Sequence, residues 1–242
     1  MISFQNVSYR PSPAEPLILD NVSFTVGKGE FVLIVGRTGS GKSVISKMLN
    51  GELKPDSGEI RVGNIIVNTL RGSALQRYRR SIGCIYHDLP LLEDKSVAEN
   101  VSFALEVIKR RGKSSIHPKV EHVLNEVGLW EKALYFPRRL SLGERQRVSI
   151  ARALVIEPLV LLADSATSQL DPESRKEIFY ILENEHIRGM TILKMVNEKD
   201  PFVTSPKGIR WLELRDGKVE DFCLLQAERT LRSPCYTPNL FY

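Results

Sequence analysis

The chain has 242 residues, 42% of them apolar, which is enough for one sizeable α/β domain with a packed core and argues against disorder. Its 34 basic and 29 acidic side chains give only a mild positive charge. The short basic runs at residues 71–80 and 109–113 lack the aromatic pattern of a nucleic-acid stacking platform, so nucleic-acid binding is disfavoured.

The three cysteines show no C-x-x-C spacing, so we predict neither a zinc site nor a disulfide framework. This cysteine usage is typical of a protein in a reducing compartment. The first residues lack the pattern of a secretory signal, and no apolar run approaches the ~20 residues that cross a bilayer. We therefore expect a cytoplasmic protein that docks on a membrane protein.

The first elements are three strands. Ile2 to Tyr9 and Leu17 to Val26 alternate apolar with polar residues, which predicts a half-buried antiparallel pair. Phe31 to Val35 is a continuous apolar run, as expected of a strand covered on both faces.

A complete phosphate-binding motif, G-x-x-x-x-G-K-[ST], follows this strand and precedes the helix-like segment Val44 to Leu49. Its glycines let backbone N–H groups turn toward phosphate oxygens, its lysine supplies charge for the β- and γ-phosphates, and its serine offers a hydroxyl to Mg²⁺. The alternative is an ordinary glycine-rich turn, but the complete motif between an apolar strand and a helix argues against it. We predict a nucleotide site at Gly36, Arg37, Thr38, Gly39, Ser40, Gly41, Lys42 and Ser43.

The middle of the chain changes character. Two short strand-like pieces lie within residues 59–68, and Ser81 to Tyr86 forms another apolar strand. Ser96 and Glu99 form a capping box that opens a helix through about Lys109, and Pro118 to Val127 opens the next. This helix-rich stretch predicts an inserted helical subdomain.

The last third again alternates strands and helices. Ser141 and Glu144 form a second capping box, opening a helix through Leu154, and a buried strand from Leu159 ends at Asp164. A helix follows the Asp171-Pro172 pair, and two final strands cover residues 190–196 and 209–214, the last leading into a hairpin turn. This alternation favours a mainly parallel sheet. Asp164 stands where a P-loop nucleotidase needs a carboxylate for Mg²⁺.

The segment from Leu140 to Leu154, LSLGERQRVSIARAL, closely resembles the signature of the ATP-binding cassette (ABC) family. The resemblance implies an α/β fold: a P-loop NTPase (RecA-like) core with a mainly parallel sheet, an N-terminal antiparallel β subdomain and an inserted α-helical subdomain. The implied nucleotide-binding domain covers residues 1–220, with the helical subdomain at about 91–155, and leaves 221–242 as a tail. The loop motifs are most similar to the branch containing the cell-division protein FtsE and the lipoprotein-release ATPase LolD.

The resemblance also assigns expected roles. Tyr9 falls where the family stacks an aromatic ring on adenine, although packing at a strand end is the alternative. Ser141, Gly143 and Glu144 begin the signature helix, which in the family closes on ATP bound to a second cassette. The resemblance thus implies ATP and Mg²⁺ as ligands, with Ser43 and Asp164 at the metal, and a dimer, expected to be a homodimer. It further implies a separate transmembrane subunit, FtsX-like by preference, received by a groove near residues 88–100.

Several positions depart from the family pattern, and these departures bear on hydrolysis as much as the matches bear on binding. His87 replaces the glutamine that positions water, Ser165 replaces the general-base glutamate, and Asn197 replaces the switch histidine. Leu142 replaces the first signature glycine. A serine hydroxyl cannot accept a proton near neutral pH, and losing a general base typically lowers the rate ~10²- to 10⁴-fold while binding persists.

We therefore expect an ATP-binding subunit of a bacterial membrane complex that hydrolyses ATP slowly or not at all, with an FtsE-like role in cell division. The first alternative is a hydrolytically active subunit of a LolD-like lipoprotein or small-molecule exporter. A soluble ABC protein acting on nucleic acid or ribosomes is the second, although such proteins generally join two cassettes in one chain.

Overall fold

The computed structural model describes residues 1–86, 91–109, 117–164, 170–197 and 209–221, and it contains two β-sheets. The smaller sheet has the strand order β2-β1-β4-β5 and is antiparallel throughout. Its first pairing joins Ile2 to Val26 and Tyr9 to Leu19, as the alternating pattern predicts. The strands are β1 (Ile2–Tyr9), β2 (Leu19–Val26), β4 (Ser57–Val62) and β5 (Ile65–Ile66).

The larger sheet has the order β10-β9-β3-β8-β7-β6 and is parallel except for its edge strand β10. Every residue of β3 and β7 is buried, in keeping with their continuous apolar sequence. The fold class predicted from the sequence is confirmed. The strands are β3 (Phe31–Gly36), β6 (Ile82–Ile85), β7 (Val160–Asp164), β8 (Thr191–Asn197), β9 (Arg210–Arg215) and β10 (Lys218–Asp221).

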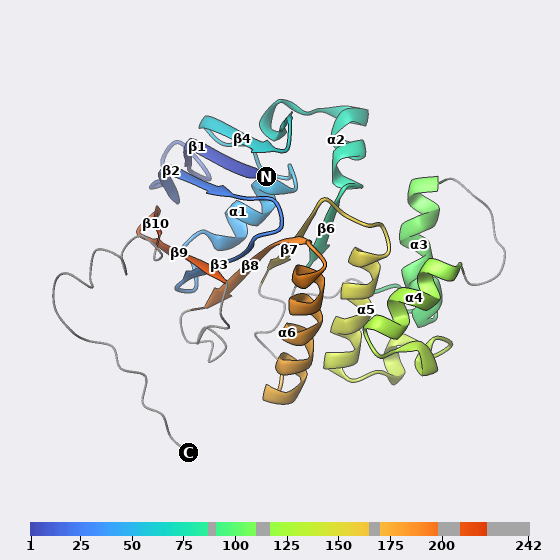
Figure 1. Ribbon diagram of the computed structural model, residues 1–242. Helices are drawn as coiled ribbons and strands as arrows, with labels where there is room; N and C mark the ends of the chain where they lie inside the picture. The colour runs from blue at the N-terminus through green and yellow to red at the C-terminus, as the bar shows by residue number, and fades with distance from the viewer. Residues whose placement is uncertain (87–90, 110–116, 165–169, 198–208, 222–242) are drawn as a thin grey trace, which may run out of the picture.

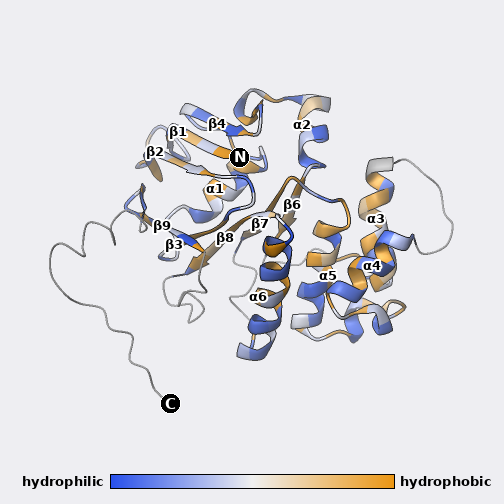
Figure 2. Ribbon diagram, viewed as in Figure 1, coloured by the Kyte–Doolittle hydropathy of each residue, from blue (hydrophilic) through white to orange (hydrophobic). Residues whose placement is uncertain are grey.

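Helices cover both faces of the larger sheet (Figure 1). They are α1 (Lys42–Leu49), α2 (Gly72–Arg79), α3 (Val97–Lys109), α4 (Pro118–Glu126), α5 (Leu142–Leu154) and α6 (Pro172–Ile187), with 3₁₀ turns at Val67–Thr69, Trp130–Lys132 and Pro137–Arg139. The protein has two apolar core clusters, one on each face of the larger sheet. One lies between the larger sheet, α1 and the smaller sheet, and the other lies between the opposite face and the helices α3, α4, α5 and α6. Figure 2 shows the apolar strands β6, β7 and β8 at the centre, and helices α5 and α6 in which apolar and polar residues alternate.

Local capping fixes where several helices begin. Both predicted capping boxes are present: the Ser96 N–H donates to Glu99 at 2.7 Å, and the Glu144 N–H donates to Ser141 Oγ at 3.2 Å. Asp171 caps α6 by accepting from the Ser174 N–H at 2.9 Å. These side chains satisfy N–H groups that a helix start leaves unpaired, so the sequence alone defines these starts.

Helix α2 is not predicted from the sequence, in which residues 71–80 show only a short basic run. Tyr78 is its one buried residue, so the helix presents almost no apolar stripe. The Tyr78 hydroxyl donates to the Leu49 carbonyl at 2.6 Å, and Arg79 donates to the Asn50 and Gly51 carbonyls. The helix is therefore held by hydrogen bonds to the end of α1. Within the described ranges, no helix combines the length and apolarity that a bilayer crossing requires.

Candidate nucleotide site

The phosphate-binding loop runs from the end of β3 to the start of α1, at the carboxyl edge of the larger sheet. Lys42 is buried, with 6% of its surface exposed, and its Nζ donates to the carbonyls of Gly36 at 2.8 Å and Arg37 at 2.7 Å. The loop thus wraps around its own ammonium group. A cation held inside a ring of backbone groups beside a helix N-terminus suits a polyphosphate.

Two loop glycines are required by conformation and space. Gly41 has a φ of 102°, in the region that favours glycine, and a Cβ there would come within 2.8 Å of Ile18 Cγ2. At Gly36 a Cβ would lie 2.5 Å from the Leu214 carbonyl oxygen, so β9 packs directly against the loop. The motif therefore depends on close neighbours from β9 and from the residue that precedes β2.

A pair of oxygen ligands lies at the mouth of the loop. Ser43 Oγ donates to Asp164 Oδ1 at 3.2 Å, which joins the first turn of α1 to the end of β7. Hydroxyl and carboxylate oxygens are ligands that Mg²⁺ accepts, with water and phosphate oxygens completing its shell. The described residues contain no cluster of three or more His, Cys, Asp or Glu side chains that could hold a metal. One hydroxyl and one carboxylate oxygen fit a magnesium ion that takes its remaining ligands from water and a polyphosphate.

Two cavities flank the loop. The smaller, about 260 Å³, is lined by Ile18, Thr38, Gly39, Gly41, Lys42, Ser43, Val44 and Asn197. The larger, about 770 Å³, is lined by residues 16–18, 36–40 and 213–217. Asn197, at the end of β8, therefore lies beside the phosphate loop where its amide can donate a hydrogen bond to an anion.

The signature segment is built differently. Ser141 caps α5, Leu142 is 43% exposed, and a Cβ at Gly143 would meet Ser174 Oγ at 2.4 Å. Burial would raise the pKa of Glu144, but hydrogen bonds from Lys132 and the Ser141 N–H outweigh it, so the pKa stays below its usual value. None of these residues lines the two cavities beside the phosphate loop. The start of the signature helix therefore lies outside the linings of these two cavities.

The other predicted site residues divide into two groups. Tyr9 ends β1, and its backbone carbonyl accepts the Ile18 N–H at 2.8 Å. Tyr9 lines neither cavity, so its stacking role stays a prediction. His87 and Ser165 lie outside the described residues. Two further segments, residues 16–18 and 213–217, form walls of the larger cavity. Nothing in their composition marks a ligand site, so the sequence does not predict them.

Comparison with known proteins agrees with this geometry. The family model described as ABC transporter matches residues 19–168, more than half of the chain. The chain belongs to the ABC transporter ATP-binding family. The cassette is 43% identical over 219 residues to the cell division ATP-binding protein FtsE of Mycobacterium tuberculosis, covering 90% of this chain and 94% of that protein. The Bacillus subtilis protein of the same name is 40% identical with the same coverage.

Solved structures give the same result. The cassette superposes with a TM-score of 0.79 on a dimeric, post-hydrolysis structure of the ATP-binding cassette MJ0796 bound to ADP and Pi. The two chains share 32% identity, and the match covers 91% of this chain and 97% of the other. This likeness supports both the fold assignment and the family.

Proposed function

We propose that the cassette binds ATP with Mg²⁺ as the nucleotide-binding subunit of a membrane complex with an FtsE-like role in cell division. The observation that carries this proposal is the phosphate loop wrapped around the buried Lys42, with Ser43 and Asp164 joined beside it. Lys42 and the loop N–H groups would hold the phosphates, while Ser43 and Asp164 would hold Mg²⁺. The FtsE relatives, named as cell division ATP-binding proteins, support the biological role.

Hydrolysis is proposed to be slow or absent. Mg²⁺ would neutralise charge on the phosphates, but attack by water also needs a group that accepts its proton. The sequence has Ser165 directly after Asp164, and a serine hydroxyl is not such a base near neutral pH. Asn197 beside the phosphate loop can donate a hydrogen bond but cannot carry charge. Binding groups are retained while the proton-accepting group is lost.

The position of the signature residues also bears on the oligomeric state of the cassette and on its partner. The solved relative MJ0796 is dimeric, and in this chain the signature residues lie away from the phosphate loop of the same chain. We propose a dimer in which the start of α5 from one cassette covers the nucleotide of the other. We further propose that residues 1–220 form the nucleotide-binding domain, with a helical subdomain at about 91–155, and that a separate, FtsX-like transmembrane subunit binds it at the inner face of the membrane.

Co-purification tests the partner. The tagged full-length cassette, extracted from its native membranes in mild detergent, is expected to retain an integral membrane protein, which mass spectrometry would identify as FtsX-like. Lys42→Ala serves as a second bait that reports whether nucleotide binding controls the association. Recovery of a lipoprotein exporter subunit would favour the alternative, an active ATPase of a LolD-like system. Recovery of the cassette with ribosomes and no membrane protein would contradict both.

A further inference from the structure

The hairpin formed by β9 and β10 contacts both the phosphate loop and the start of β2. The Leu214 carbonyl lies so close to the phosphate loop that a Cβ at Gly36 would come within 2.5 Å of it. At the hairpin turn, the Gly217 carbonyl accepts the Asp20 N–H at 2.8 Å, just after Ile18. One hairpin therefore contacts the start of the phosphate loop, in the larger sheet, and the start of β2, in the smaller sheet.

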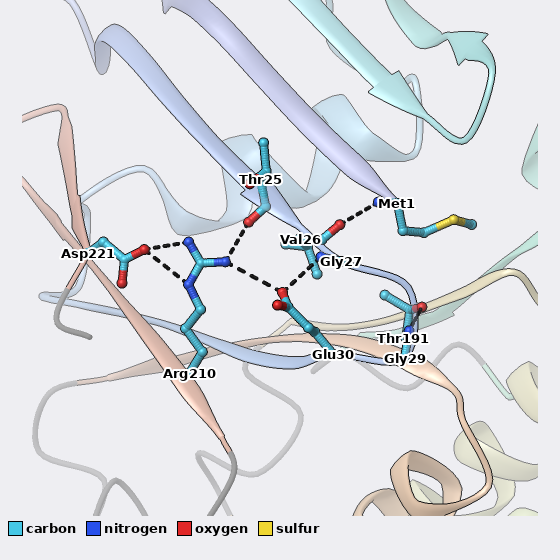
Figure 3. Close-up of polar contacts among 9 residues, drawn as sticks. All are labelled: Met1, Thr25, Val26, Gly27, Gly29, Glu30, Thr191, Arg210 and Asp221. Atoms are coloured by element: carbon cyan, nitrogen blue, oxygen red, sulfur yellow. Dashed lines mark hydrogen bonds and ion pairs between the residues drawn. The ribbon is translucent and has the colours of Figure 1, made fainter. Parts of the chain in front are cut away.

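The opposite end of the same hairpin is fastened by one guanidinium group (Figure 3). Arg210, which begins β9, donates from Nε to Asp221 Oδ2 at 3.0 Å and forms a second bond to the same oxygen from Nη2. Its Nη1 donates to the Thr25 carbonyl at 2.8 Å and lies 3.4 Å from Glu30 Oε2. The side chains of Arg210 and Asp221 keep only 25% and 19% of their surface exposed, so water screens this pair less than an exposed pair.

This group of contacts, which we call the Arg210 clasp (Arg210, Asp221, Glu30 and the Thr25 carbonyl), joins the two sheets. Thr25 belongs to β2, whereas Arg210 and Asp221 belong to β9 and β10. The hydrogen bonds to Asp221 raise the pKa of Arg210, despite the opposing effect of burial. Glu30 is itself oriented, because Oε2 accepts the Gly27 N–H at 2.8 Å. The hairpin is thus attached to β2 at two points, the clasp and the Asp20–Gly217 bond.

The position of the hairpin also defines the space beside the phosphate loop. Residues 213–217 form one wall of the 770 Å³ cavity, and residues 16–18 and 36–40 form the others. Strand β9 is also paired in parallel with β3, from Val32 opposite Arg210 to Val35 opposite Glu213, so loss of the clasp would leave this pairing in place. A shift of β10 and the hairpin turn would then change the width of this cavity and the support under Gly36. A binding loop that is held in its bound shape before the ligand arrives binds more tightly than one that must be ordered.

We propose that Arg210 and Asp221 are positioning residues for the nucleotide site: the clasp fixes the β9–β10 hairpin, which holds the phosphate loop and the Pro16–Ile18 segment in their binding arrangement. Neither residue lines the two cavities beside the phosphate loop, and both would act through Leu214 and Gly217. The proposal rests on the ATP binding proposed above, but its structural part concerns the cassette without ligand.

Hydrogen exchange and ATP binding in the full-length chain test the clasp. Asp221→Ala is expected to speed amide exchange at residues 36–43 by about fivefold or more without nucleotide, and to weaken ATP binding by about threefold to tenfold. Asp221→Glu, which can restore the ion pair, is expected to stay within about twofold of the wild type in both measurements. If the alanine variant fails to fold, Asp221→Asn, which keeps the shape and removes the charge, replaces it.

Glu177→Ala is the matched control, because Glu177 forms an ion pair with Arg147 that joins α6 to α5, away from the hairpin, and the Arg147 side chain is only 16% exposed. A purely structural role for the clasp predicts that both alanine variants lose thermal stability without selective exchange at the loop. Unchanged exchange at residues 36–43 in Asp221→Ala, or equal acceleration in Glu177→Ala, would overturn the proposal. A wild-type chain that binds no ATP would instead refute the proposed function, and the exchange measurement would still decide the role of the clasp.

Discussion

Lys42→Ala is expected to weaken ATP binding by about 100-fold or more, because it removes a charged donor that is already placed inside the phosphate loop. The Nζ bonds to the Gly36 and Arg37 carbonyls show that the loop itself holds the ammonium there. The variant also leaves space where a buried side chain stood, so folding is checked first by circular dichroism and thermal melting. Isothermal titration with ATP and Mg²⁺ then measures affinity.

Lys47→Ala provides the control for this prediction. Lys47 belongs to the same helix and carries the same charge, but its side chain is exposed and lines neither cavity. We expect its ATP affinity to stay within about twofold of the wild type, because a solvated surface charge contributes little to binding a ligand elsewhere. Equal affinity in the two variants would show that the phosphate loop is not the nucleotide site.

Ser165→Glu is expected to increase steady-state ATP turnover by about 10²-fold, because it supplies a carboxylate directly after Asp164 that can accept a proton from water. Asn197 and His87 are unchanged in this variant, so we do not expect the full rate of an intact cassette. Release of inorganic phosphate from the purified full-length chain measures the effect, with Lys42→Ala defining the background.

Ser165→Gln distinguishes a base from a change of size. Glutamine has nearly the shape of glutamate but cannot take up a proton near neutral pH, so turnover should stay at the wild-type level. A similar increase in both variants would mean that side-chain volume, rather than basicity, limits the rate. A wild-type rate that already equals that of Ser165→Glu would refute slow hydrolysis and favour the active-transport alternative.

The sequence predicted the parts of the fold that depend on local signals. The capping boxes at Ser96 and Ser141 and the Asp171 cap define helix starts through contacts three residues apart, so the pattern contains them. Helix α2 escaped prediction because its stability comes from bonds to the end of α1, made by Tyr78 and Arg79 with carbonyls 28 or 29 residues earlier. The periodicity of apolar residues within a helix does not indicate contacts with residues so far away in the sequence.

The same distinction applies to the site. The phosphate loop is one continuous motif, and its lysine lies inside the loop, bonded to the Gly36 and Arg37 carbonyls, while its role in phosphate binding stays a prediction. Asn197 came from the family pattern, and the structure places it beside that loop. The hairpin wall could not be predicted, because Arg210 meets the Thr25 carbonyl across 185 residues of sequence and only through the packing of two sheets.

The most direct test of the account is the identity of the nucleotide that the wild-type cassette retains. The full-length chain is incubated with Mg²⁺ and ATP, freed of unbound nucleotide by rapid gel filtration, and the bound fraction is identified by chromatography over a time course. We predict stoichiometric nucleotide that remains ATP, with turnover well below the ~1 s⁻¹ that marks the lower range of typical enzymes. A chain that retains no nucleotide, or one that holds ADP while releasing phosphate rapidly, would contradict the account.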